Sequence, residues 1–147
     1  MKRCLGILGL SFLLVACGDD NASTNEESKG NVVATTGQIA DAVKVISGDH
    51  LAVTTLMGPG VDPHLYKATQ SDLTKLDNAQ VIFYNGLHLE GQMQDIFDQM
   101  AEEKTVQAVA ENLDKNKLLE DEEDATLNDP HVWFDIDLWK EVVDVIG

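Results

Sequence analysis

The chain has 147 residues and carries 10 basic against 26 acidic side chains, which gives a formal net charge of −16 at pH 7. This balance argues against a nucleic-acid partner and against electrostatic adhesion to anionic lipid, because both depend on clustered Lys and Arg side chains. A charge of this sign attracts small cations instead, and the length suits a domain with a true hydrophobic core.

The N-terminal segment has the pattern of a secretory signal. Lys2 and Arg3 precede an apolar run over 5–15 that is too short to span a bilayer but suits a signal peptide. The sequence Leu-Val-Ala-Cys ending at Cys17 resembles a bacterial lipobox, in which cleavage before the cysteine leaves a thiol that is lipidated. We predict a signal peptide over 1–16 and a lipidated flexible tether over 17–30. The alternative is an ordinary secretory signal with a chance cysteine.

Cysteine usage restricts the metal chemistry that the folded part can perform. Cys4 would be removed with the signal and Cys17 would carry acyl chains, so that no thiol remains beyond residue 17. A disulfide framework and a cysteine-based zinc or iron–sulfur site are therefore excluded. A metal site has to use imidazole and oxygen ligands, which suit zinc, manganese or iron.

Beyond residue 30, short β-rich runs alternate with segments of helical periodicity. The predicted strands are Asn31–Thr36, Leu51–Met57, Gln80–Tyr84 and Thr105–Val109, and the predicted helices are Gln38–Ile46, Ser71–Ala79, Gln92–Met100 and Asp137–Ile146. Such alternation implies right-handed βαβ crossovers. We predict an α/β fold, with a mostly parallel four-stranded sheet flanked by helices over 31–147.

The end of the chain carries two further features. An acidic run over 120–124 is interpreted as a solvated loop, with a metal-capturing lid as the alternative. The last predicted helix has a wide apolar face and is followed only by Gly147, from which we expect a truncated protein. The aromatic residues Trp133, Phe134 and Trp139 are expected to pack in the core rather than to form a ligand platform.

The histidines can be sorted by the strand ends that they follow, because ligands of such sheets bind beyond the carboxyl ends of the strands. His64 follows the second predicted strand and His88 follows the third, so both belong to the ligand-binding edge. His50 opens the second strand and is expected to be a surface residue at the opposite edge.

The tripeptide Asp-Pro-His occurs twice, ending at His64 and at His131. Proline fixes φ and so lowers the entropy that is lost when a neighbouring ligand is ordered. The preceding carboxylates, Asp62 and Asp129, can accept the second N–H of an imidazole and so select the nitrogen that faces a metal. An ordinary helix N-cap followed by proline is the alternative. The residues alone leave both interpretations open.

Motifs of nucleotide-binding and nucleophilic enzymes are missing. Gly58-Pro59-Gly60 lacks the Gly-Lys-Ser/Thr of a phosphate-binding loop, and the serines show no Gly-x-Ser-x-Gly. There is also no His-Glu-x-x-His that would place a general base beside metal ligands.

Three motifs behind the lipobox carry a resemblance to a known family. They are GPGVDPHLY over 58–66, YNGLHLE over 84–90 and DPHVWFD over 129–135. In this order they resemble the zinc and manganese solute-binding proteins of bacterial metal-uptake ABC transporters, over essentially all of 31–147. The resemblance implies one lobe of a two-lobed metal-binding protein, with His64 and His131 as the ligands from this lobe. His88 matches a position that is usually not a ligand, and we assign it with Asp62 and Asp129 to the surroundings of the ligands.

In the family the third and fourth ligands come from a second lobe, which this sequence does not reach. The acidic loop also lacks the histidines that some zinc-binding members carry there, so zinc and manganese both remain open. The resemblance implies an extracytoplasmic, lipid-anchored receptor, in the periplasm or at the cell surface. It would capture divalent zinc or manganese as the transported ligand and deliver it to an ABC permease, without enzymatic activity. The alternatives are a metal-dependent hydrolase using His64 and His131, or a surface adhesion protein.

Overall fold

The computed structural model describes residues 29–122 and 124–147. The predicted signal peptide, Cys17 and most of the predicted tether lie outside these residues. Gly30, which was assigned to the predicted tether, belongs to the first strand. Within the described residues no helix is both long enough and apolar enough to cross a membrane.

All eight predicted helices and strands are present, with ends shifted by at most two residues. The strands are β1 Gly30–Ala34, β2 Leu51–Thr55, β3 Val81–Tyr84 and β4 Thr105–Ala108. The helices are α1 Gly37–Ser47, α2 Gln70–Asn78, α3 Gln94–Ala101 and α4 Ile136–Ile146. Short 3-10 turns, η1, η2 and η3, lie over 91–93, 115–117 and 132–134. The turn at 91–93 accounts for the late start of α3.

The four strands form one parallel sheet in the order β2-β1-β3-β4. This confirms the predicted fold class. The register pairs Val33 of β1 with Thr54 of β2 on one side and with Ile82 of β3 on the other. The chain runs outward from β1 to β2 and then crosses back to β3, so the order reverses between β1 and β3. Open α/β sheets bind ligands at such a point, beyond the carboxyl ends of the strands.

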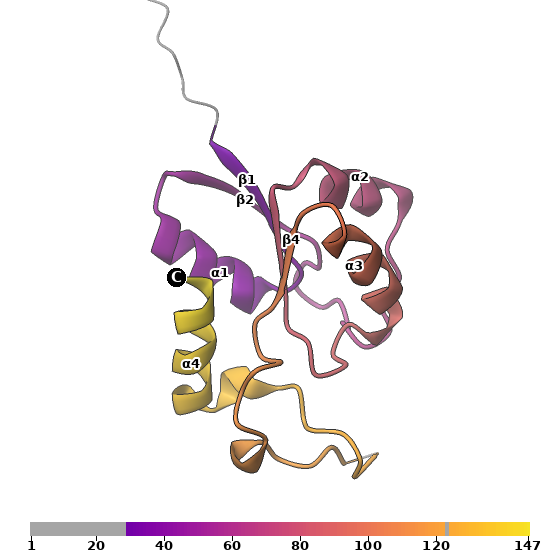
Figure 1. Ribbon diagram of the computed structural model, residues 1–147, viewed down its shortest axis with the longest axis vertical. Helices are drawn as coiled ribbons and strands as arrows, with labels where there is room; N and C mark the ends of the chain where they lie inside the picture. The colour runs from indigo at the N-terminus through magenta and orange to yellow at the C-terminus, as the bar shows by residue number, and fades with distance from the viewer. Residues whose placement is uncertain (1–28, 123) are drawn as a thin grey trace, which may run out of the picture.

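Helices cover both faces of the sheet, with α1 and α4 on one face and α2 and α3 on the other (Figure 1). Val32 and Ala34 of β1 pack with α1 and α4, while Val33 between them packs with α2 and α3. A strand that is buried on both faces needs a continuous apolar run, which explains the sequence Val-Val-Ala in β1.

The loop between β2 and α2 carries His64, and hydrogen bonds to Asp72 hold it at the start of α2. The carboxylate of Asp72 accepts hydrogen bonds from the hydroxyl of Tyr66 at 2.6 Å, the hydroxyl of Thr69 at 2.6 Å and Nζ of Lys75 at 2.9 Å. Burial alone would raise the pKa of Asp72, but these donors outweigh it and hold the pKa well below its usual value. Burial and the neighbouring carboxylate together raise the pKa of Tyr66 to about 12.

Candidate metal site

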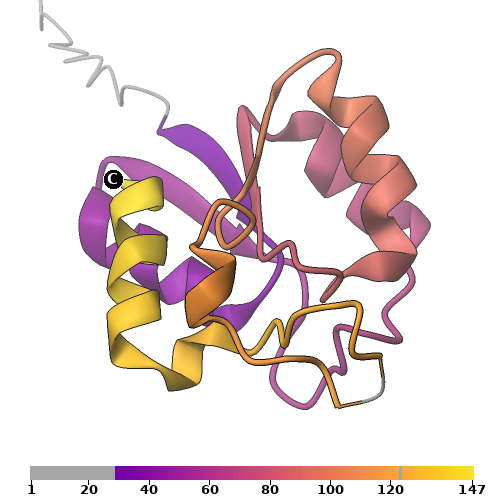
Figure 2. The same cartoon turned by 60° about the horizontal axis from the view of Figure 1, so that its bottom comes forward.

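The structure brings His64 and His131 together, although they are 67 residues apart in the sequence. The loop after β2 carries His64, and the long segment between β4 and α4 carries His131; the two segments run side by side beyond the carboxyl ends of the strands (Figure 2). The Nε2 atoms of the two rings lie 3.4 Å apart, and the ring planes are tilted by 46°. Two of the four histidines therefore share one position at the ligand-binding edge of the sheet.

Asp129 selects the tautomer of the neutral His131 ring. Its Oδ1 lies 2.6 Å from Nδ1 of His131 and also accepts the backbone N–H of His131 at 2.9 Å. A carboxylate can only accept, so in the neutral ring the proton sits on Nδ1 and the lone pair on Nε2. Burial would raise the pKa of Asp129, but the bonds from His131 outweigh it and leave the pKa lowered.

Asp62 behaves differently from its counterpart in the second Asp-Pro-His. Its Oδ1 accepts the backbone N–H of His64 at 3.0 Å, which forms a turn, but it is not bonded to the ring. The predicted contact between carboxylate and imidazole is therefore present at His131 and absent at His64. The ring of His64 is exposed, whereas His131 is half-buried.

The distance between the two Nε2 atoms suits a shared cation. Zinc binds imidazole nitrogen at about 2.0–2.1 Å, so two nitrogens 3.4 Å apart would subtend an angle of about 110° at the ion, close to tetrahedral. A lone pair on Nε2 of His131 that faces the second imidazole across this gap is a favourable place for a positive charge. Among the described residues, no group of three or more His, Cys, Asp or Glu side chains could hold a metal ion. The candidate ligands in the described part of the chain are therefore two imidazoles.

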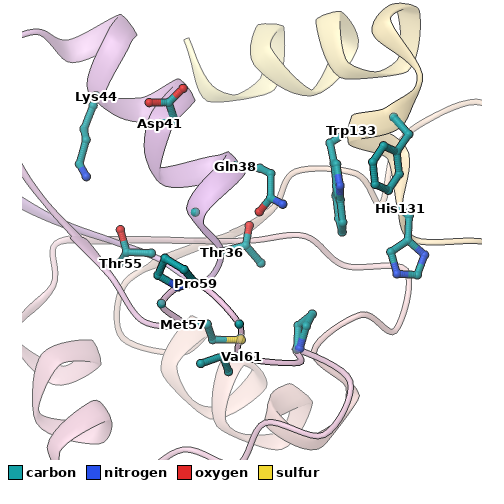
Figure 3. A pocket seen from close by; sticks show the side chains of 15 residues that line it. Thr36, Gln38, Asp41, Lys44, Thr55, Met57, Pro59, Val61, His131 and Trp133 are labelled. Carbon is teal, nitrogen blue, oxygen red and sulfur yellow. The ribbon is translucent and has the colours of Figure 1, made fainter.

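A cleft of about 830 Å³ adjoins this pair, between the start of α1, the loop after β2 and the turn η3 (Figure 3). Its wall is largely apolar and includes Met57, Pro59, Val61, Trp133 and Phe134. The rings of His131 and Trp133 meet edge to face, with centroids 5.2 Å apart. Trp133 thus packs against the candidate ligand from the side of the cleft.

The expectation that all three aromatic residues near the end of the chain pack in the core is wrong for Trp133 and for Phe134, which is 83% exposed. The 3-10 turn at 132–134 buries Val132 instead and turns Phe134 toward solvent. Trp133 is half-buried at the cleft, and only Trp139 packs against the core from α4.

The other two histidines make no contact with this pair within the described residues. His50 is exposed directly before β2, at the opposite edge of the sheet, as predicted. His88 is exposed on a turn after β3, with φ of 61°, and its ring makes no hydrogen bond or ring contact within the described residues. The described part of the acidic run is largely exposed, as a solvated loop would be, and a single bridge between Glu120 and Asn128 closes its turn.

Two buried residues near the site were not singled out by the sequence. Glu90 is 2% exposed and Asn85 is fully buried, both just beyond β3. The side chain of Asn85 donates to the carbonyl of Pro130, directly before His131, at 3.0 Å. Both residues lie in the motif YNGLHLE. Its Asn-Gly indicates an ordinary turn, and nothing else in the motif indicates that Asn85 and Glu90 are buried.

Known proteins resemble this chain over nearly its whole length. It is 52% identical over 140 residues to the manganese-binding lipoprotein MntA of Bacillus subtilis, covering 95% of this chain and 45% of MntA. It is 36% identical to the iron ABC transporter substrate-binding lipoprotein MtsA of Streptococcus pyogenes, covering 93% of this chain and 46% of MtsA. The chain thus spans about half the length of these relatives.

A solved structure resembles the fold as well. The periplasmic zinc-binding protein TroA of Treponema pallidum superposes with a TM-score of 0.76 and 47% identity, over 80% of this chain and 42% of TroA. The family described as zinc-uptake complex component A, periplasmic, matches residues 32–147. Because this match extends over most of the chain, the protein belongs to the family of the periplasmic component A of zinc-uptake complexes.

Proposed function

We propose that this chain is a metal-binding lobe of an extracytoplasmic receptor that captures divalent zinc or manganese for an ABC permease. The observation that carries the proposal is the pair of Nε2 atoms 3.4 Å apart, one of them oriented by a carboxylate. His64 and His131 are the proposed ligands, and the metal is the cargo. The names of the relatives MntA, TroA and MtsA, which refer to manganese, zinc and iron, support cargo of this class.

An enzymatic function is not part of the proposal. Within the described residues, the carboxylate beside the pair is that of Asp129, which is occupied by two hydrogen bonds from His131. A hydrolase that used the two histidines would need a further group to activate water next to the ion. The relatives that the chain matches are named as binding proteins of transport systems, which supports binding without turnover.

The proposal includes attachment to a membrane through a lipid on Cys17, with the polar tether over 17–29 as a spacer. Relatives named as lipoproteins support this anchor. Each buried CH₂ of an acyl chain adds about 0.8 kcal/mol of membrane affinity, and the acidic tether adds none. Cys17→Ala should therefore move the protein from the membrane fraction to the soluble fraction. A Cys17→Ala protein that stayed in the membrane fraction would contradict the lipid anchor. That result would not bear on the proposed metal ligands.

The affinity of two imidazole ligands can be bounded. A complete structural zinc site supplies about 10–16 kcal/mol, so half of the ligands would supply roughly 5–8 kcal/mol. That range corresponds to a dissociation constant between about 1 µM and 0.2 mM. Calorimetric titration of this chain with zinc and with manganese measures it directly.

The histidine variants decide whether the proposed ligands bind the metal. His64→Ala and His131→Ala should each reduce the affinity for zinc at least tenfold, because each removes one of two ligands. His50→Ala is the matched control, since His50 is exposed at the opposite edge of the sheet, and it should leave the affinity unchanged. Equal losses in His50→Ala and His64→Ala would refute the assignment.

A further inference from the structure

A strained turn follows β3 at the point where the strand order reverses. Three successive residues have left-handed φ values: Gly86 at 82°, Leu87 at 51° and His88 at 61°. Glycine adopts this region freely, but each side-chain-bearing residue there costs about 1–2 kcal/mol. Two such residues in sequence persist only where the surroundings hold the backbone in place, and strain of this kind gathers at ligand sites.

Two carboxylates hold this turn by its backbone N–H groups. Glu90 accepts the N–H of Asn85 at 2.9 Å and the N–H of Gly86 at 3.3 Å, and Glu111 accepts the N–H of Leu87 at 3.0 Å. Successive N–H groups that point into one concavity form an anion site, which here is filled by carboxylates of the same chain. The hydroxyl of Thr35, directly after β1, also donates to Glu90 at 2.6 Å. Glu90 therefore joins the ends of the two central strands.

The side chain of Asn85 connects the turn to the candidate metal site. Nδ2 of Asn85 donates to the carbonyl of Gly86 at 3.1 Å and to the carbonyl of Pro130 at 3.0 Å. Asn85 is fully buried, and Pro130, 45 residues further along, is among the most buried residues of the chain. The Oδ1 of Asn85 is buried without a hydrogen-bond partner within the described residues, which costs free energy. The amide nitrogen of Asn85 thus serves two carbonyl groups, while its oxygen has no partner within the described residues.

We propose that Asn85 is a positioning residue for the metal ligand His131. The strained turn, held by Glu90 and Glu111, presents the amide of Asn85, which fixes the carbonyl of Pro130 and thereby the backbone that enters His131. The proline ring fixes φ of Pro130, and a held carbonyl also fixes the orientation of the planar peptide bond that leads to His131. Asp129 then selects the nitrogen of the ring that faces His64. The inference rests on the proposed metal-binding function.

Asn85→Leu tests the proposal, because leucine has a similar shape but cannot donate to Pro130. Removing the amide also removes the unpartnered Oδ1, which offsets part of the lost stability. The affinity for zinc should fall about tenfold, as it does when a group that supports a ligand is lost. Glu111→Ala releases the N–H of Leu87 at an exposed position that tolerates substitution, and should lower the affinity about threefold. It keeps the test decisive if Asn85→Leu fails to fold.

Lys104→Met is the matched structural control. Nζ of Lys104 donates to the carbonyls of Leu76 and Asp77 at 3.0 and 2.5 Å, at the amino end of the sheet and away from the histidines. It should lower the melting temperature without changing the affinity for zinc. If Lys104→Met weakened zinc binding as much as Asn85→Leu, general loosening would explain both effects and the proposal would be overturned.

A second measurement needs no metal. The Nδ1 proton of His131, hydrogen-bonded to Asp129, should give a downfield NMR signal in the metal-free protein. Asn85→Leu should shift or broaden this signal, whereas Lys104→Met should leave it in place. An unchanged signal in folded Asn85→Leu refutes the positioning role whether or not the protein binds zinc. If Asn85→Leu shifts the signal but the unsubstituted protein binds no metal, the positioning of His131 is supported and the proposed function is refuted.

Discussion

Removing the carboxylate of Asp129 tests how the environment of a ligand sets its affinity, because the second Asp-Pro-His provides an internal comparison. In Asp129→Ala, His131 loses two hydrogen bonds, one to its backbone N–H at 2.9 Å and one to its ring at 2.6 Å. In Asp62→Ala, His64 loses only the bond to its backbone N–H, at 3.0 Å. The difference between the two variants therefore isolates the bond to the ring.

The expected magnitudes follow from these contacts. Loss of a carboxylate behind a histidine ligand typically costs 10–100-fold in metal affinity, or about 1.4–2.8 kcal/mol. Loss of an exposed turn bond costs about 0.5 kcal/mol, which is roughly twofold. Asp129→Ala should thus weaken zinc binding at least about fivefold more than Asp62→Ala. Competition titration against a zinc-chelating dye measures both, with circular dichroism to verify that each variant is folded. Equal effects in the two variants would show that the bond to the ring does not contribute.

Three other predictions concern the fold that supports the site. Asp72→Asn should lower the free energy of unfolding at pH 7 by about 1–3 kcal/mol. Urea denaturation at several pH values should show that the free energy of unfolding of the variant changes less at acidic pH. The sign follows from the lowered pKa of Asp72: the ionised carboxylate stabilises the fold above its unfolded-state pKa near 4, and this is lost as pH falls through the folded-state pKa. Phe97→Ala should cost about 3–5 kcal/mol, because the ring is 1% exposed and stacks on Tyr84 with centroids 4.3 Å apart; thermal unfolding with a loss below about 1 kcal/mol would contradict the packing. Gly86→Ala should destabilise more than Gly60→Ala, since both have φ above 80° but only at Gly86 would a Cβ approach neighbours at 3.0–3.1 Å, and equal melting temperatures would show that crowding is unimportant.

The sheet could be predicted from the sequence because the pattern of apolar residues within each segment indicates a strand or a helix. The apolar runs near Val33 and Ile82 have strand character, while Ile39 and Val43 recur at helical spacing, so the alternation and the parallel sheet followed. Ends of elements were less certain, as at α3, where a 3-10 turn replaces the predicted first residues of the helix. Phe134 was misplaced because apolar character alone does not reveal which side of a short turn faces the core.

The sequence singled out the two histidines that the structure brings together, but it did not indicate their surroundings. His64 and His131 end the two copies of Asp-Pro-His, and the family resemblance implied both as ligands. Of the two, strand order placed only His64 at this edge, because His131 lies far beyond the end of β4. The two motifs are identical in sequence, yet only Asp129 reaches the ring of its histidine, because that depends on the side-chain torsions of each loop. The contact from Asn85 to Pro130 joins residues 45 apart, and no periodicity within the sequence encodes such a pairing.

The separation of 67 residues between the two histidines also makes metal binding by both rings depend on folding. To bind one ion with both rings, an unfolded chain would have to close a loop of that length, and the entropy of such a closure is roughly 4 kcal/mol in the chain-entropy model. The native sheet has already brought the loop ends together, so the ion binds the folded chain far better than the unfolded one. A metal ion held by both proposed ligands would therefore act as a reversible cross-link between the first and second halves of the chain, and the unfolded chain would compete poorly with the folded one for scarce metal.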